Sequence, residues 1–381
     1  MVKTIKCKLL PTPEQVGPLH NTLAIYASAC NRILTTAKET GTKHKFSLHK
    51  LCYHDIKTST PLTSNYIIRA IARVAGAFGK GKRLPHSFKP TSLDLDSRLF
   101  TLFDDKKLLS LSTVSGRQKI AIKLGSYQLK HLSNQDPTAA TISYNHRRKL
   151  FYLNLCIKVQ EPIARGSTPL GIDLGIKRIA TTSEGVMYSG RRTNRTRTKY
   201  QLIRASLQRK KSRPMSTTKG RRTNVWKVLK RLGSRQRLFT KDVNHCISKA
   251  LVQHAKDHDY YIVLEDLTNI RKSTKRLNKT TRRLVNSWSF YQLQQFIGYK
   301  AKALGVKVIY IKPQYTSQSC SGCGCLGSRI KHKFTCIHCN RTMDADVNAA
   351  VNIAALGASV NGPKVTLPLS PAISSDKLLT V

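Results

Sequence analysis

The period of apolar and polar positions changes along the chain and separates stretches of different predicted structure. Residues 2–10 alternate in part and predict a strand. Apolar residues then recur at helical spacing and predict helices at 18–38, 47–58 and 63–78. Short alternating runs with turn chemistry between them predict strands at 99–103, 108–113, 119–124, 140–144 and 149–159. A row of short strands favours a β barrel or small sandwich. The first strand could join this sheet, which would make the helices an insertion within a β domain.

The first helix carries a start signal ahead of its apolar spacing. Thr12 suits the N-cap, Pro13 the first turn, and Gln15 the third helical position of a capping box. Gly17 and Pro18 follow at once, and proline disrupts a helix interior. The pattern therefore predicts that the main helix begins only after this pair.

A buried carboxylate marks the beginning of the second half of the chain. Residues 169–182 predict a buried strand, a tight reversal and a second strand, with Asp173 among apolar neighbours. An aspartate is costly to bury unless it binds a cation or hydrogen-bond donors. The alternative interpretation is a turn aspartate at the end of a strand.

Two further acids also stand at the ends of apolar elements. Residues 260–265 predict a buried strand that ends in Glu265. Helical spacing follows at 286–304, and another strand is predicted at 306–311. Asp346 then opens an apolar helical pattern, where as a lone feature it would be a helix cap. This order of strands and helices is that of an RNase H-like domain.

Charge identifies the predicted partner. The 381 residues include 67 Lys and Arg against 19 Asp and Glu, a formal net charge of +48. Such a charge repels itself unless a polyanion neutralises it, so nucleic acid is the predicted partner. A ribosomal or chromatin-like protein would share this feature, so charge alone does not imply an enzyme. No apolar run suggests a membrane span or signal peptide, and we expect no membrane partner.

The most basic stretch runs from 191 to 241 without an acidic residue. Such a run can be a solvated face or a disordered arm. Apolar residues at roughly helical spacing favour two basic helices that line a nucleic-acid channel. The candidate nucleic-acid contacts are Arg191, Arg192, Arg195, Arg221, Arg222, Lys227, Lys230 and Arg231.

Five of the ten cysteines are crowded between residues 320 and 339. Two Cys-x-x-Cys knuckles, with twelve residues between them, can place four thiolates around one Zn²⁺. The predicted zinc ligands are Cys320, Cys323, Cys336 and Cys339. Four thiolates leave no open position, so we expect a structural zinc, with redox chemistry as the alternative. Cys325 and His338 are additional metal-ligating residues in this segment, so either could replace one of the four predicted ligands.

Together the three acids favour one shared site over three unrelated helix caps or turns. They are Asp173, Glu265 and Asp346. Three carboxylates that converge on one edge could hold two Mg²⁺ ions. These ions would activate a water and stabilise the leaving oxygen in phosphodiester hydrolysis.

Four motifs follow one another along the chain: Gly-Ile-Asp-Leu-Gly at 171–175, Leu-Glu-Asp-Leu at 264–267, the first cysteine knuckle with its flanks at 315–324, and Asp-Ala-Asp-Val-Asn-Ala-Ala-Val-Asn-Ile at 344–353. In this order they resemble the TnpB family of transposon-encoded, RNA-guided nucleases, which are related to type V CRISPR effectors. The N-terminal residues 9–15 also resemble the family. The resemblance implies a RuvC-like nuclease domain with Asp173, Glu265 and Asp346 as catalytic, Mg²⁺-binding acids.

The expected fold is therefore α/β and multidomain: an RNase H-like (RuvC) nuclease domain with a zinc ribbon, plus an N-terminal β-barrel domain that carries a helical insertion. The expected boundaries are 1–10 and 91–165 for the wedge-like barrel, 11–90 for the helical recognition insertion, 166–318 and 341–356 for the nuclease domain, 319–340 for the ribbon, and 357–381 for a disordered tail.

The resemblance also implies an activity and its partners. The barrel and inserted helices would hold a guide RNA and read a short motif beside the double-stranded DNA target, which guide pairing would select. One protein monomer per guide RNA is favoured, in a prokaryotic cytoplasm or nucleoid. The alternative is an RNA-guided regulator or transposition accessory protein that does not cleave. A transposase that joins strands itself is a third hypothesis.

Overall fold

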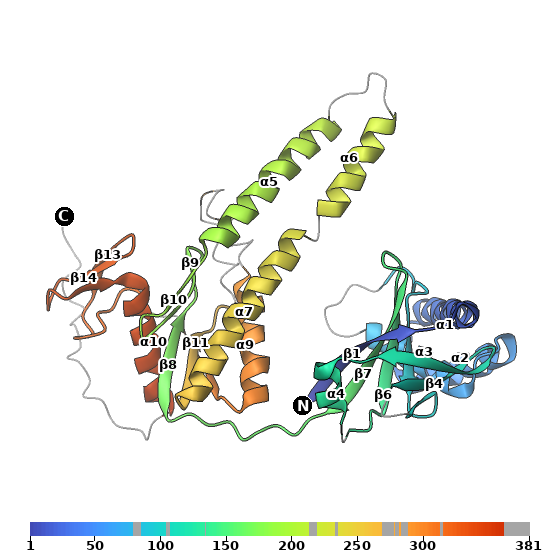
Figure 1. The fold of residues 1–381 in the computed structure, drawn as a ribbon. Coiled ribbons are helices and arrows are strands. Elements are labelled where there is room, and N and C mark those ends of the chain that lie inside the picture. The colour runs from blue at the N-terminus through green and yellow to red at the C-terminus, as the bar shows by residue number, and fades with distance from the viewer. Residues whose placement is uncertain are drawn as a thin grey trace. The chain divides into compact units, whose positions relative to one another are not determined.

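A computed structural model describes residues 1–78, 85–103, 107–133, 135–212, 219–232, 235–268, 278, 282, 289–312 and 315–361. The chain divides into two compact units, Met1–Gln160 and Glu161–Val381 (Figure 1). Each unit has its own sheet and its own core. Within the described residues, no helix combines the length and the apolar character that crossing a membrane requires.

The first unit is built on a seven-stranded antiparallel sheet, an open half-barrel with the strand order β2-β6-β7-β1-β5-β4-β3. Its strands are β1 (Val2–Leu10), β2 (Ser92–Asp96), β3 (Phe100–Phe103), β4 (Leu108–Thr113), β5 (Gly116–Lys123), β6 (Ala139–Asn145) and β7 (Leu150–Lys158). As predicted, the N-terminal strand joins this sheet, where it pairs with β7 on one side and β5 on the other. Alternate residues of β1 and β7 are buried, which is the pattern of a sheet with one face on the core.

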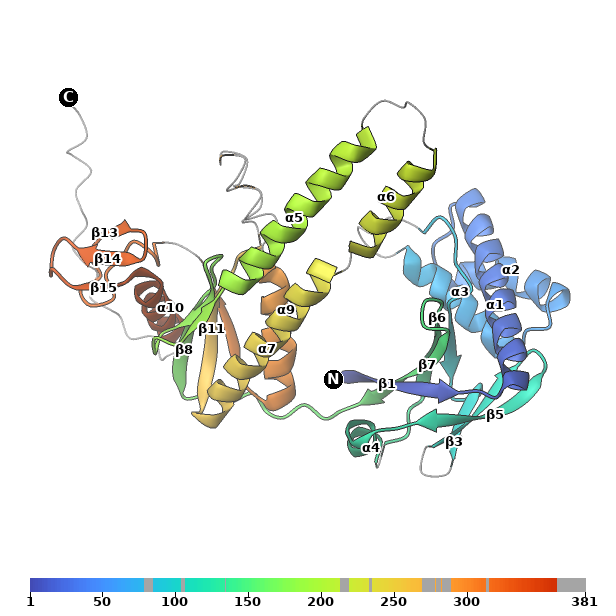
Figure 2. The ribbon, with the colours of Figure 1, turned by 45° about the horizontal axis from the view of Figure 1, so that its top comes forward.

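Three helices between β1 and β2 pack on this sheet (Figure 2). They are α1 (Pro13–Glu39), α2 (Lys45–Ser59) and α3 (Ser64–Ala77). The capping box at Thr12 and Gln15 is present. The predicted break at Gly17 and Pro18 is wrong, because α1 runs through both. Proline costs this helix one hydrogen bond close to its start, and burial of Leu19 and the rest of the apolar face offsets that cost.

Two elements of this unit were not predicted from the pattern. Strand β2 has two acids among its five residues, yet the guanidinium of Arg73 on α3 pairs with Asp94 at 2.8 Å. The short helix α4 (Ser126–Leu132) begins with a hydrogen bond from Gly125 N–H to the side chain of Gln128 at 3.0 Å. Strand β2 combines this ion pair with alternating burial of Leu93 and Leu95, whereas α4 depends on its side-chain cap.

The second unit contains a five-stranded sheet with the order β10-β9-β8-β11-β12. Its strands are β8 (Thr168–Asp173), β9 (Arg178–Thr182), β10 (Met187–Ser189), β11 (Tyr260–Glu265) and β12 (Val308–Ile311). The first three pair as antiparallel neighbours, and β11 is parallel to both β8 and β12. This is the strand order of an RNase H-like sheet, as predicted.

Helices cover both faces of this sheet (Figure 1). On one face, α7 (Arg235–Asp257) and α9 (Phe290–Leu304) share a core with residues of β8 and β11. On the other, α10 (Ala345–Asn361) packs on β8. A Cβ built at Gly171 would lie 2.0 Å from the carbonyl oxygen of Ala350, so only glycine lets α10 approach β8 this closely.

The basic stretch forms the two predicted helices, α5 (Arg191–Ser212) and α6 (Lys219–Leu232). Helix α7 follows α6 in the chain. Helix α10 continues to Asn361, so the disordered tail expected from Gly357 does not begin there. Gly357 packs instead against β11, where an added Cβ would meet Val263 at 2.4 Å. The rest of the predicted tail, 362–381, lies outside the described residues.

A small three-stranded antiparallel sheet lies between β12 and α10 in the chain. It consists of β13 (Gly327–Ile330), β14 (Lys333–Cys336) and β15 (Thr342–Asp344), in that order. The cysteine knuckles flank β13 and β14, and Phe334 is buried among Cys320, Cys336 and Ala345. This is the ribbon that the cysteine spacing predicted.

Candidate metal centres and nucleic-acid interface

The three predicted acids come from neighbouring elements of the second unit. Asp173 ends β8 and Glu265 ends β11, and these parallel strands pair Ile172 with Leu264 one residue earlier. The two carboxylates therefore leave the sheet side by side at its carboxyl edge. Asp346 stands in the first turn of α10, which packs on β8.

The negative charges of Glu265 and Asp346 act on the carboxyl group of Asp173. Burial raises the pKa of Asp173 to about 7, and the negative charges of Glu265 and Asp346 add to this shift. Burial also raises the pKa of Glu265, although the Thr316 hydroxyl donates a hydrogen bond to its Oε1 at 2.5 Å, which opposes the shift. A carboxyl group that keeps its proton beside two other acids is in a site that a cation would stabilise.

Asp346 is buried with cationic partners on both oxygens. Arg329 Nη2 donates to Oδ1 at 2.7 Å, and Arg178 Nη1 donates to Oδ2 at 3.2 Å. His332 Nδ1 lies 3.5 Å from Oδ2. Because Arg329 and His332 belong to the ribbon segment, the ribbon contributes directly to the surroundings of this acid.

The cap of α10 is Asp344 rather than Asp346. Its Oδ1 accepts hydrogen bonds from the backbone N–H groups of Asp346 at 3.0 Å and Val347 at 3.3 Å, which corrects the interpretation of Asp346 as a helix cap. The same oxygen accepts a hydrogen bond from Arg178. Burial opposes ionisation of Asp344, but the hydrogen bond from Arg178 and those from the backbone outweigh it and lower the pKa of Asp344.

Two asparagines attach α10 to the base of the ribbon. Asn348 Nδ2 donates to the carbonyl of Ser319 at 2.7 Å, and its Oδ1 accepts a hydrogen bond from Ser321 N–H at 2.9 Å. One turn later, Asn352 donates to the carbonyls of Thr316 and Ser319. The Asn-x-x-x-Asn spacing therefore places Thr316, the hydrogen-bond donor to Glu265, relative to the helix that carries Asp346.

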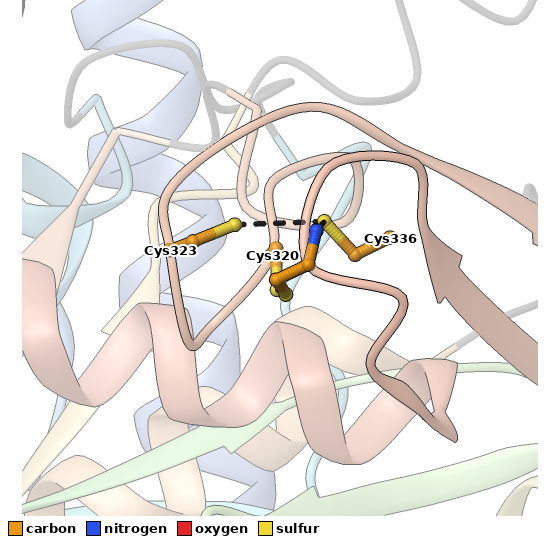
Figure 3. A group of neighbouring side chains, drawn as sticks. Cys320, Cys323 and Cys336 are labelled. Atoms are coloured by element: carbon orange, nitrogen blue, oxygen red, sulfur yellow. Dashed lines mark hydrogen bonds between the residues drawn. The ribbon is translucent and has the colours of Figure 1, made fainter.

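The four knuckle cysteines converge as the spacing predicted. Their sulfur atoms all lie within 4.8 Å of one another. The Cys323 and Cys336 sulfurs are 3.5 Å apart, and Figure 3 shows these two side chains pointing toward each other. The Cys320 and Cys339 sulfurs are 3.6 Å apart. Four thiols at these separations fit the tetrahedral S₄ set that structural zinc prefers.

Backbone donors also favour the thiolate state within the ribbon. Burial opposes ionisation of Cys320, yet the N–H groups of Gly322 and Cys323 lower its pKa to about 6. The N–H of Cys339, 3.4 Å from the Cys336 sulfur, lowers the pKa of Cys336. Thiolates are the form that binds metal.

The predicted basic contacts lie on the surface of α5 and α6. Six of the eight residues are described with their side chains, and all six are exposed: Arg191, Arg192, Arg195, Lys227, Lys230 and Arg231. The side chains of Arg221 and Arg222 lie outside the described residues. Trp226 is 54% exposed, and Lys230 Nζ lies 5.5 Å from the centre of its ring.

Sequence reasoning missed several residues of these sites. Arg178, Arg329 and Thr316 contact the acids through pairings of distant segments, for which the chain has no local signal. Asp344 lies only two residues before Asp346, and its capping role became clear from the position at which α10 begins. Trp226 was counted only as one of the apolar positions of a basic helix. Its exposure among cations, rather than its residue type, is what suggests a stacking role.

The five-stranded sheet and the ribbon together have the fold of an RNase H-like (RuvC) domain with a zinc-ribbon-like cysteine cluster. The chain aligns with a Cas12f1–sgRNA–target DNA complex over 93% of its residues and 98% of that chain, with a TM-score of 0.60 and 14% identity. It also aligns with the mini-RNA-guided endonuclease CRISPR-Cas_phi3 over 96% and 93%, with a TM-score of 0.56 and 10% identity. At these identities, the likeness establishes the fold.

Sequence comparison gives closer similarities. Residues 290–353 match the family model described as Cas12f1-like, TNB domain. The TnpB-like protein MJ0751 of Methanocaldococcus jannaschii is 39% identical over 33% of this chain and 46% of its own length. Cas12f1 of Sulfoacidibacillus thermotolerans is 33% identical over 57% and 53%, and the putative RNA-guided DNA endonuclease InsQ of Escherichia coli is 30% identical over 53% and 52%.

These comparisons confirm the resemblance to TnpB-like and Cas12f1 proteins that the motifs indicated. The chain spans about half the length of the curated relatives that it matches.

Proposed function

We propose that the chain is an Mg²⁺-dependent, RNA-guided DNA endonuclease of transposon origin that cuts beside a short motif in the target. The observation that carries the proposal is the convergence of Asp173, Glu265 and Asp346 at one edge of an RNase H-like sheet, where burial and the two other acids raise the pKa of Asp173. Relatives named as endodeoxyribonucleases and RNA-guided DNA endonucleases support the same activity.

In this proposal, the three carboxylates hold two Mg²⁺ ions, because hard oxygen ligands and a surplus of negative charge suit that ion. When bound, the metals activate a water and stabilise the leaving oxygen of the phosphodiester. Thr316 orients one oxygen of Glu265 by its hydrogen bond. Arg178 and Arg329 neutralise Asp346 in the metal-free chain, so ion binding competes with their pairing.

The other parts of the chain would then bind the guide RNA and the target DNA. The first unit, with the wedge-like sheet strands at 1–10 and 91–165 and the recognition helices at 11–90, would hold the guide RNA and read the adjacent motif. The nuclease domain would comprise 166–318 and 341–356, with a zinc ribbon at 319–340. The exposed cations of α5 and α6 suit the backbone of a bound strand, and guide pairing supplies sequence specificity.

The direct test is cleavage of a target library by the full chain with its co-purified RNA and Mg²⁺. We expect Asp173→Ala to reduce cleavage below detection and to leave RNA and DNA binding within about twofold. Asp257→Ala, which removes an exposed acid from the end of α7, is the matched control and should cut like the parent chain. Undiminished cutting by Asp173→Ala would contradict the proposed site.

A second candidate function is an RNA-guided DNA-binding regulator or transposition accessory protein that does not cleave. The same experiment separates the two functions, since a regulator binds its target in a guide-dependent way but leaves the DNA intact at every Mg²⁺ concentration. Sequencing the RNA that co-purifies with the chain identifies the guide for both cases.

A further inference from the structure

The ribbon contains a second group of metal-ligating side chains besides the four knuckle cysteines. The Cys323 and Cys325 sulfurs and a ring nitrogen of His338 all lie within 4.8 Å of one another. Cys323 therefore belongs to both groups, whereas Cys325 and His338 have no place in the S₄ set.

The local backbone accounts for this second group. Gly324 has a φ of +76°, a left-handed conformation that glycine adopts readily, and its N–H donates to the carbonyl of Cys320 at 2.9 Å. The N–H of Cys320 in turn donates to the carbonyl of Cys325 at 2.8 Å. This tight loop folds the chain back just after the first knuckle and keeps Cys325 beside Cys323.

The two groups differ in exposure. The S₄ set contains two buried cysteines, Cys320 and Cys336, and two exposed ones, Cys323 and Cys339. In the second group Cys323 and His338 are exposed and Cys325 is half-buried against the ribbon core. A second ion can therefore approach two of its three ligands directly from solvent.

We propose that Cys323, Cys325 and His338 bind a second Zn²⁺, which shares the Cys323 thiolate with the structural ion. Two thiolates and an imidazole are an established zinc donor set that leaves the fourth position for water. A Zn²⁺ held by four thiolates carries two excess negative charges, and a second Zn²⁺ with the Cys325 thiolate reduces that excess to one. The charge balance therefore favours binding of the second ion next to the first.

The test is the zinc content of the full chain, freed of nucleic acid, saturated with Zn²⁺ and desalted. We expect two zinc ions per chain in the parent protein and one in Cys325→Ser and in His338→Ala. Cys246→Ser and His44→Ala remove an exposed cysteine and an exposed histidine elsewhere and should keep two ions. A parent chain that holds one zinc overturns the proposal, and so does a Cys325→Ser variant that still holds two.

Cobalt provides a readout that does not depend on counting ions. Titration of the zinc-free parent chain with Co²⁺ should show two successive phases of thiolate charge-transfer absorption, of which Cys325→Ser lacks the second. A chelator should remove the second ion first, because three protein ligands hold it rather than four. The readouts are independent of DNA cleavage, so a failure of the nuclease proposal and a failure of this one are distinguishable.

Discussion

Asp173 keeps its proton to a higher pH than an ordinary aspartate because two conditions oppose its charge. The side chain lies at the end of a buried strand, and Glu265 and Asp346 add negative potential. Both conditions disfavour the ionised form, and a divalent cation reverses both of them. At the scale of single residues, the pKa values of Asp173 and Glu265 are therefore raised, and a cation bound at the proposed site would favour their ionised forms.

The raised pKa of Asp173 determines the sign of a pH effect on stability. In the metal-free folded chain, Asp173 holds its proton up to about pH 7, whereas the unfolded chain loses it near its ordinary pKa of about 4. The folded state binds more protons in that window, so the free energy of unfolding falls as pH rises from 4 to 7. Asp173→Asn removes this loss. We expect its Tm to exceed that of the parent by several degrees at pH 8, and to match it at pH 4, in thermal unfolding without added Mg²⁺.

Magnesium supplies the control for this pH effect. Added Mg²⁺ should raise the Tm of the parent chain at pH 8 and leave Asp173→Asn almost unchanged, since binding to the folded state stabilises it. Equal Mg²⁺ responses in the two proteins would contradict the assignment of Asp173 as a ligand.

Substitution of Asp344 tests the contribution of a helix cap that is also an ion pair. One oxygen of Asp344 both caps α10 and pairs with Arg178. Asp344→Ala loses the cap and the ion pair, and we expect about 1–2 kcal/mol less stability. Asp344→Asn preserves capping but not the charge, so its loss should be smaller, with weaker Mg²⁺ binding in both variants. Chemical denaturation and calorimetric Mg²⁺ titration measure the two effects. If the Asn and Ala variants lose equal stability, the cap has no part in it.

At the scale of elements, the position of α10 decides where Asp346 lies. The helix packs on β8 at Gly171, and Asn348 and Asn352 attach it to the loop that contains Thr316. Two of the three acids are thus fixed by one strand pairing, and the third is fixed by one helix-to-strand contact. A displacement of α10 would separate Asp346 from the other two acids.

Gly171→Ala tests that contact. The new methyl group would lie 2.0 Å from the carbonyl oxygen of Ala350, so α10 must move, and we expect about 1–3 kcal/mol less stability together with weaker Mg²⁺ binding. Gly298→Ala in α9 is the matched control. Its nearest neighbour is the Tyr310 hydroxyl at 3.7 Å, an ordinary contact, so it should be neutral or slightly stabilising. Chemical denaturation and calorimetry give both quantities.

The sequence predicted these elements where one physical signal dominated. Buried strands such as β8 and β11, and the cysteine knuckles at fixed spacing, depend on local patterns and were predicted correctly. Strand β2 was missed although Leu93 and Leu95 alternate with polar residues, because five residues with two acids give a weak signal. The course of α1 through Pro18 depends on packing, so no local pattern revealed it. For the same reason, the residues that hold the acids in place became visible only in the structure.

At the scale of the whole molecule, the charge of +48 requires a polyanion, but it does not select one. Neutralisation of phosphates releases counterions, so the affinity of such a protein for any nucleic acid falls steeply with salt. Selectivity for a guide must come from contacts that salt does not affect, such as stacking of bases on aromatic rings. The exposed ring of Trp226 among the cations of α6 offers a surface for a contact of this kind.

Two variants of α6 separate these contributions. Lys227→Gln removes an exposed charge, and we expect the slope of log affinity for single-stranded RNA against log salt concentration to become shallower by about 0.7. Trp226→Ala removes a stacking surface, and we expect a loss of about 1–3 kcal/mol at every salt concentration with an unchanged slope. Fluorescence anisotropy across a salt series measures both. Because Lys230 lies against the Trp226 ring, a slope that changes in Trp226→Ala would mean that the ring acts only by positioning this cation.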